Sequence, residues 1–258
     1  MSLLKPYHRN FRGFIEGPNS GYSMKAYIID KEYAKSPEHF VRAFLLIQDD
    51  LKRLFEYVEP SDDSKATYSY RIHELLMRTC IEIEANFKAI LNENIYIPQK
   101  DRFNNDIYNI GVYKKINVTH HLSSYQVSLP IWNGASKIFE PFKNWSVGGS
   151  LSWYQAYNES KHNRQELFKK ANLENLLNAV TALLILLSSQ FCDEDFSPAS
   201  RTLGVSGYDY HEMSPALGDY FRISFPSDWT DAEAYEFDWA ALKNAADRFD
   251  QIDFNAIP

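Results

Sequence analysis

The chain has little cysteine, with only Cys80 and Cys192 among 258 residues. The two stand far apart and in no ligand spacing, so neither a disulfide scaffold nor a cysteine-based zinc site is expected. Both fall in apolar helical patterns, where a buried free thiol is the usual role. The adjacent His120 and His121 point apart on a helix or a strand and make a poor metal pair. We therefore expect no metal ion and no cofactor.

Long apolar runs are also missing. The longest, from Ala179 to Leu187, is about half the length that a membrane span needs. The N-terminal stretch MSLLKPYHRNFRGF lacks the apolar segment of a secretory signal. These two observations predict a cytoplasmic protein that does not cross a membrane.

Runs of like charge, repeats and low-complexity tracts are absent too, and the formal net charge is −7. This acidity excludes a generally basic coat for nucleic acid, but a local basic cleft is still compatible with it, because binding depends on the local field. Hydrophobic residues make up 45% of the chain and aromatic residues 15%, which indicates a well-filled core. The length suits one large domain or a core with an appended lobe.

Two segments repeat apolar residues at steps of three and four, which predicts two long helices. The first covers about 37–58, with Ser36 as its N-cap and Pro37 at its first position. The second covers about 65–93 and carries a polar stripe on its other side. The stripe is either a solvated face or the wall of a cleft. Its members are Arg71, Glu74, Arg78, Glu82 and Asn86.

The middle of the chain mixes patterns. Residues 101–122 are ambiguous, since Asn104 to Asp106 are placed to cap a helix that Gly111 interrupts. Alternating Tyr125, Val127, Leu129 and Ile131 then predict a strand.

Two further helices are expected after this strand. Ser150 is placed to cap a helix over about 151–169, and Asn172 to cap a helix over 173–191. The second of these is apolar nearly all round, which is typical of a central helix.

The composition changes beyond Phe191. Phe221, Ile223 and Phe225 alternate as in a strand, and Asp238 is placed to cap a short helix. About 65 residues with few aliphatic side chains form only a thin core. We therefore divide the chain into an N-terminal arm (1–35), a helical core domain (36–192) and a C-terminal extension that packs on the core (193–258).

The segment directly before the most apolar helix is crowded with polar groups. On one continuous helix, Asn158 and His162 lie along one side, and Lys161 and Arg164 along the next. A histidine gives and takes protons near neutral pH, and the two cations can hold a phosphate.

Aromatic residues precede these two rows. Tyr154 and Tyr157 each stand one helical turn before them, and such rings can stack on a base. The combination suits cleavage of an RNA phosphodiester without a metal. The alternative is a solvated helix surface, on which His162 is a surface residue and Asn158 bonds locally.

The order of these elements is paired long helices, then the motif N-x-x-K-H-x-R from Asn158 to Arg164, then a strongly apolar helix. This order resembles the HEPN superfamily of all-helical domains over about residues 37–191. The resemblance implies a mainly α, HEPN-like helical bundle, here with a short β element and a mixed C-terminal tail. Many members are metal-independent endoribonucleases of bacterial defence and toxin systems that work as dimers. Many others are inactive nucleotide-binding or scaffold domains.

The motif departs from that of active members, which carry an arginine separated from the histidine by a few residues. The positions where it belongs hold Gln155, Ala156 and Tyr157. If the chemistry is kept, His162 is the acid or base, and Arg164 or Lys161 replaces the usual arginine.

Active members also add a polar residue from an earlier helix, and either Arg78 or Glu82 matches it by position. The resemblance thus implies a protein that binds RNA or nucleotides. If it is active, it cuts RNA as a homodimer, and an antitoxin-like protein is its expected partner. Two alternatives stay open: a non-catalytic interaction or scaffold protein that retains the fold, and a small-ligand binder.

Overall fold

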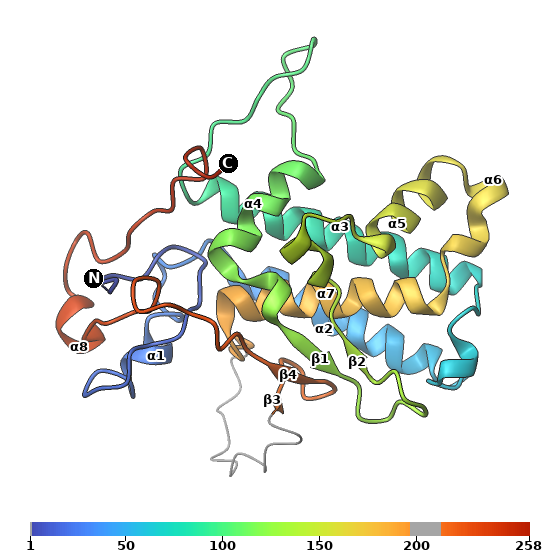
Figure 1. The fold of residues 1–258 in the computed structure, drawn as a ribbon, viewed down its shortest axis with the longest axis horizontal. Coiled ribbons are helices and arrows are strands. Elements are labelled where there is room, and N and C mark those ends of the chain that lie inside the picture. The colour runs from blue at the N-terminus through green and yellow to red at the C-terminus, as the bar shows by residue number, and fades with distance from the viewer. Residues whose placement is uncertain (1, 197–212) are drawn as a thin grey trace.

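The computed structural model describes residues 2–196 and 213–258, so residues 197–212 of the expected C-terminal extension lie outside it. Within these ranges the protein is mainly helical, as predicted, with a small antiparallel sheet of short strands. The long helices α2 (Pro37–Leu54), α3 (Tyr70–Asn92) and α7 (Leu173–Phe191) lie side by side, and α5 (Ser152–His162) packs on α3 and α7 (Figure 1). Shorter pieces are α1 (Ser23–Ala26), α4 (Ile110–His120), α6 (Arg164–Leu167), α8 (Trp239–Leu242), η1 (Asp62–Ser64), η2 (Leu122–Ser124), η3 (Lys143–Val147) and η4 (Phe168–Lys170).

Helix α7 is the central helix that its all-round apolar sequence predicts. Every residue from Ala179 to Phe191 is buried. Asn172 caps the helix as expected, because its side chain accepts a hydrogen bond from the amide of Asn175 at 3.0 Å. By length and composition alone α7 could cross a membrane, but 83% of its apolar window is buried within the protein, as in a core helix.

The start of α2 corrects one prediction. Pro37 is its first residue, but Ser36 makes no capping hydrogen bond. The backbone of Ser36 is left-handed, with φ 47°, whereas a capping side chain needs extended backbone. The helix also ends at Leu54 rather than near residue 58, and Val58 closes a turn onto the Leu54 carbonyl at 3.1 Å.

The expected start of α3 near residue 65 is wrong for a reason that involves α7. The carbonyls of Lys65 and Thr67 accept hydrogen bonds from the amides of Glu174 and Leu173, at 3.1 and 2.8 Å. These amides belong to the first turn of α7 and have no partner within their own helix. These two carbonyls bond to α7 and not within a longer α3, and α3 begins only after Ser69, whose hydroxyl caps it.

The predicted continuous helix over 151–169 is also wrong. Leu151, not Ser150, occupies the N-cap position of α5, and it makes no side-chain capping bond. At Asn163 the backbone leaves the helical region, with φ −132° and ψ 57°. Helices α6 and η4 follow this break, so Lys161 and Arg164 do not lie along one side of a single straight helix as predicted.

Helix α4 resolves the ambiguous region after residue 100. Asn109 caps it by accepting hydrogen bonds from the amides of Gly111 and Val112 at 3.0 and 3.1 Å. The predicted caps at Asn104 to Asp106 are therefore wrong. Gly111 lies in the first turn of α4 and does not interrupt it.

The small sheet joins the middle of the chain to the C-terminal segment. Its order is β2 (Ile138–Phe139), β1 (Gln126–Ser128), β4 (Arg222–Ser224), β3 (Ser214–Pro215), with all pairs antiparallel. Val127 lies opposite both Phe139 and Ile223, and all three are buried. The expected strand around Ile223 is thus confirmed. The first predicted strand is shorter than expected, and Ile131 beyond it is half exposed.

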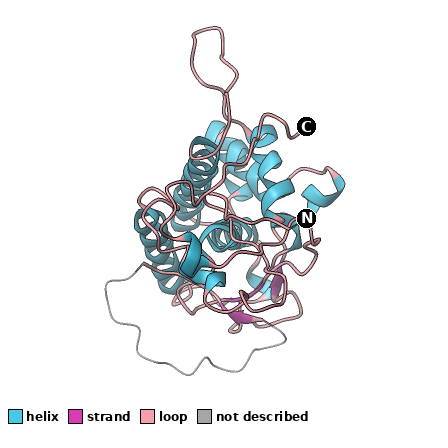
Figure 2. Cartoon of the chain, turned by 90° about the vertical axis from the view of Figure 1, so that its left-hand side faces the viewer, coloured by secondary structure: helices cyan, strands magenta, loops and turns pink. Residues whose placement is uncertain are grey.

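The N-terminal arm and the C-terminal segment lie together at one end of the bundle, where loops cover much of the surface (Figures 1 and 2). Tyr235 donates from its amide to the Gly13 carbonyl at 2.9 Å and accepts from the Ile15 amide at 3.0 Å. Helix α8 begins after Asp238, whose side chain accepts a hydrogen bond from Ala240, as predicted.

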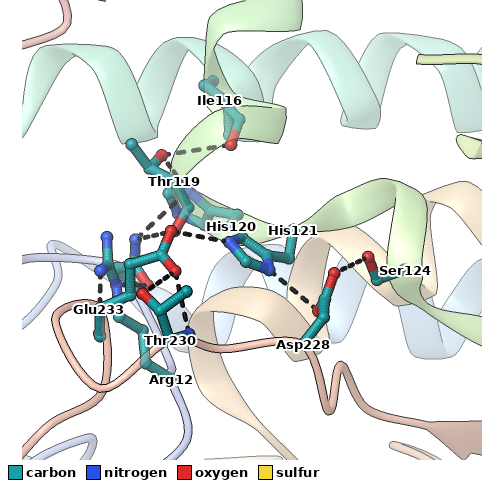
Figure 3. Close-up of polar contacts among 10 residues, drawn as sticks. Arg12, Ile116, Thr119, His120, His121, Ser124, Asp228, Thr230 and Glu233 are labelled. Carbon is teal, nitrogen blue, oxygen red and sulfur yellow. Dashed lines mark hydrogen bonds and ion pairs between the residues drawn. The ribbon is translucent and has the colours of Figure 1, made fainter. Parts of the chain in front are cut away.

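His121 connects the C-terminal segment to the corner after α4 (Figure 3). Its ring nitrogens lie 3.0 Å from Asp228 Oδ1 and 3.2 Å from Glu233 Oε1. Ser124 donates to the other oxygen of Asp228 at 2.7 Å, and the His121 ring stacks on Trp229 with 3.9 Å between centroids. These contacts hold a segment distant in sequence against the helical core.

Candidate nucleic-acid interface

The polar motif lies at the end of the bundle opposite the two termini (Figure 1). We call residues 158–170, which cover the last turns of α5, the break at Asn163, α6 and η4, the basic corner. The corner holds four cations against two acids, a local charge of +2. The whole chain carries −7, so all other residues together carry −9. The cations are Lys161, Arg164, Lys169 and Lys170, and the acids are Glu159 and Glu166.

These cationic side chains are accessible to a ligand. All four are exposed, and the nearest acidic partner is Glu159, 3.9 Å from Lys170 Nζ. The side chain of Arg164 makes no hydrogen bond or ion pair with any residue that the structure describes. Little of this positive charge is therefore neutralised by the protein itself.

Tyr154 and Tyr157 form the buried support of the corner. Tyr154 donates its hydroxyl proton to Glu84 Oε1 of α3 at 2.9 Å, which ties α5 to α3. Burial, with Glu84 adding to it, raises the pKa of Tyr154, so this hydroxyl stays a donor at neutral pH. Tyr157 is 1% exposed and Tyr154 8%, so neither residue offers a ring face on which a base could stack.

Tyr157 also fixes the position of Lys161. The Lys161 Nζ donates to the Tyr157 hydroxyl at 3.1 Å and lies 5.1 Å from the centre of that ring. This hydrogen bond raises the pKa of Lys161, which therefore stays charged at neutral pH. One cation of the basic corner is thus held in place.

Arg78 belongs to a different site from the basic corner. Its guanidinium pairs with Asp50 of α2. It also lines a cavity of about 610 Å³ between α2 and α3, to which neither α5 nor α6 contributes. The cavity is lined by Asp50, Arg53, Leu54, Glu56, Tyr57, Arg71, Glu74, Leu75 and Arg78. The first half of the polar stripe of α3 therefore faces a cleft, and His162 does not line this cleft.

The second half of the stripe is partly covered. Burial raises the pKa of Glu82, and the neighbouring Arg78 only partly offsets this. Asn86 is fully buried and accepts a hydrogen bond from Gln190 of α7 at 3.2 Å.

Glu84 is the carboxylate of α3 that bonds to α5, and the sequence reasoning missed it. A signal was present, since Glu84 stands four residues after Cys80 and three before Phe87, on the apolar side of the helix. A charged residue on an apolar face needs a hydrogen-bonding partner. Tyr154 is that partner.

Two exposed tyrosines pack against the half-buried Phe168 of the basic corner, and this contact was also missed. The Phe168 ring centre lies 4.9 Å from that of Tyr70 and 5.8 Å from that of Tyr68. We call these three rings the aromatic shelf. Tyr70 is 70% exposed and Tyr68 43%. Lys169 Nζ lies 6.0 Å from the centre of the Tyr68 ring, so the shelf adjoins the cations.

Asn158 and His162 complete the placement of the predicted site residues. Asn158 is half-buried, and His162 is exposed at the last residue of α5. Its ring has no hydrogen bond to any residue within the described ranges. Proton transfer by His162 therefore requires a substrate or a second chain to orient the ring.

Comparisons with known proteins add no relative. No protein-family model, no curated protein and no solved structure matches this chain. The HEPN-like relationship therefore stays a prediction, and the basic corner and the aromatic shelf are the features from which a function can be inferred.

Proposed function

We propose that this protein is a HEPN-like helical protein that binds RNA or nucleotides through the basic corner. The observation that carries the proposal is the concentration of four exposed cations in ten residues of a chain that is otherwise strongly acidic. Phosphates are drawn to such a local field even when the net charge of the protein is negative. Acidic surface elsewhere disfavours binding at other places, which directs a polyanion to this end of the bundle.

Two of the cations suit complementary roles. Lys161 is held by Tyr157 and provides a fixed positive charge. Arg164 follows the helix break and has no competing partner among the described residues, so its guanidinium is free to bind one phosphate through two hydrogen bonds.

RNA cleavage is a second candidate, favoured by the exposed imidazole of His162 between these two cations in the sequence. In this mechanism the ring takes the 2′-OH proton and the 2′-oxygen attacks the phosphorus to form a 2′,3′-cyclic phosphate. The P–O5′ bond breaks, the leaving 5′-oxygen takes a proton from water, and the cations stabilise the charged phosphate, so no metal is needed. Incubation of tRNA in EDTA tests it directly. Cutting that His162→Ala abolishes would support catalysis, whereas intact tRNA with both proteins would leave binding alone.

The proposal of RNA binding is tested by fluorescence anisotropy with a short labelled single-stranded RNA. The test variant is Lys161→Gln with Arg164→Gln. At roughly 0.1 M salt each phosphate contact on a single strand contributes about fivefold to affinity, so two lost contacts should weaken binding about 25-fold.

The control variant, Lys31→Gln with Arg42→Gln, removes the same charges from exposed positions outside the corner. It should change the dissociation constant less than about twofold if binding is local. Equal losses of affinity in both variants would mean that binding depends on the net charge of the protein and not on the basic corner. No binding by the wild type would favour the non-catalytic scaffold.

A further inference from the structure

The aromatic shelf has an exposed position that packing does not explain. Tyr70 is the first residue of α3, and most of its side chain faces solvent although its ring touches Phe168. The planes of these two rings meet at 44°, and Tyr68 meets the edge of Phe168 at 89°. Such a cluster buries only part of each ring, and the open face of Tyr70 is available to a flat ligand.

The backbone beneath the shelf is fixed. Tyr68 pairs with Asn172, the Thr67 carbonyl accepts the Leu173 amide at 2.8 Å, and Ser69 caps α3. Because these bonds join the start of α3 to the start of α7, the two tyrosines are held before any ligand arrives. A preorganised surface binds more tightly than one that must be ordered on binding.

An unsatisfied polar atom lies next to the shelf. The His73 ring packs against Phe168, with 5.5 Å between centroids and an angle of 45° between the ring planes. Its Nε2 is covered from solvent and has no hydrogen-bond partner within the described chain. Buried polar atoms of this kind are rare in native proteins and are usually satisfied by water or a ligand.

We infer that the aromatic shelf stacks an unpaired base, so that this end of the protein selects single-stranded RNA over duplex. The inference rests on the proposed function, because the neighbouring Lys169 and the other cations of the basic corner are needed to hold the flanking phosphates. Bases of a duplex are already stacked within the helix, whereas those of a single strand present a free face.

The test measures affinity for a labelled single strand and for a duplex of the same sequence. Tyr70→Ala removes the stacking of one base, so this variant should bind the single strand about 5- to 150-fold more weakly than the wild type. Duplex binding, which depends on phosphates, should be unchanged. Tyr70→Phe keeps the ring and should bind like the wild type. Tyr22→Ala removes a tyrosine that is 64% exposed at the other end of the molecule and serves as the matched control.

The following outcomes decide the inference. Selective loss in Tyr70→Ala with retention in Tyr70→Phe supports stacking. No loss in Tyr70→Ala, or equal losses for single strand and duplex, overturns it, and so does a loss in Tyr70→Phe as large as that in Tyr70→Ala. If Lys161→Gln with Arg164→Gln weakens binding while Tyr70→Ala does not, the shelf fails and RNA binding at the basic corner stands.

Discussion

Removal of the charge of Glu93 should strongly destabilise the protein. The Glu93 carboxylate accepts hydrogen bonds from Arg9 Nε at 2.7 Å and from the Lys35 amide at 2.9 Å. The Arg9 side chain is 0% exposed and that of Glu93 10%, so this is a buried ion pair between the N-terminal arm and the end of α3.

Glu93→Gln keeps the shape but leaves a buried guanidinium without its negative partner. The remaining partners of Arg9 are neutral, with Gln190 Oε1 at 2.8 Å and the Lys35 carbonyl at 2.7 Å. Breaking a buried pair by removing one charge costs about 3–5 kcal/mol. We therefore expect the free energy of unfolding, measured by urea denaturation, to fall by roughly this amount.

Asp247→Asn provides the contrast. Asp247 pairs with Lys5 at 2.7 Å, but its own side chain is 83% exposed, and exposed ion pairs contribute little to stability. If Glu93→Gln costs no more than Asp247→Asn, the arm is not anchored by this ion pair and the reasoning is refuted.

Two smaller perturbations test other contacts. Asn172→Ala removes the cap of α7 and should lower the unfolding free energy by about 1 kcal/mol. Asn172→Asp keeps a capping oxygen and should retain most of the stability of the wild type. Equal stability of all three proteins in urea would contradict the capping role. Partial burial alone would raise the pKa values of Asp228 and Glu233. Hydrogen bonds from Ser124 and His121 to Asp228, and from Thr230 and His121 to Glu233, have the opposite and larger effect, so both pKa values are lowered. A lowered carboxyl pKa stabilises the fold above the unfolded pKa, and this stability is lost as the pH falls through the folded value. Unfolding free energies measured from about pH 6 to about pH 3 should therefore decline less steeply in His121→Ala than in the wild type, and parallel curves would count against the His121 contacts.

Local sequence patterns were enough to predict the parts of the fold that local interactions determine. The apolar run after Asn172 predicted a capped central helix, and α7 is that helix. The alternation around Ile223 likewise predicted β4. In both cases the burial pattern is encoded in neighbouring residues, although the ladder hydrogen bonds of β4 are made to β1 and β3.

Errors occurred where distant segments decide the backbone. Residues 65–68 do not join α3, because the carbonyls of Lys65 and Thr67 bond to the first turn of α7, which the local pattern around α3 does not reveal. The break at Asn163 has no proline or glycine to signal it, so the sequence predicted one long helix.

The candidate site was predicted in part. The sequence identified Lys161 and Arg164, which the structure places in the exposed basic corner. It did not identify Glu84 or the contact between Tyr70 and Phe168, because each joins residues about 70 or more positions apart through tertiary packing.

The salt dependence of RNA binding tests the central claim most directly, namely that the cations of the basic corner hold RNA phosphates. If each of the four cations neutralises one phosphate of a single strand, log Kobs should fall with log salt with a slope of about −2.8. In Lys161→Gln with Arg164→Gln the slope should shrink to about −1.4. Identical slopes in the two proteins, or affinity that does not change with salt, would contradict the claim.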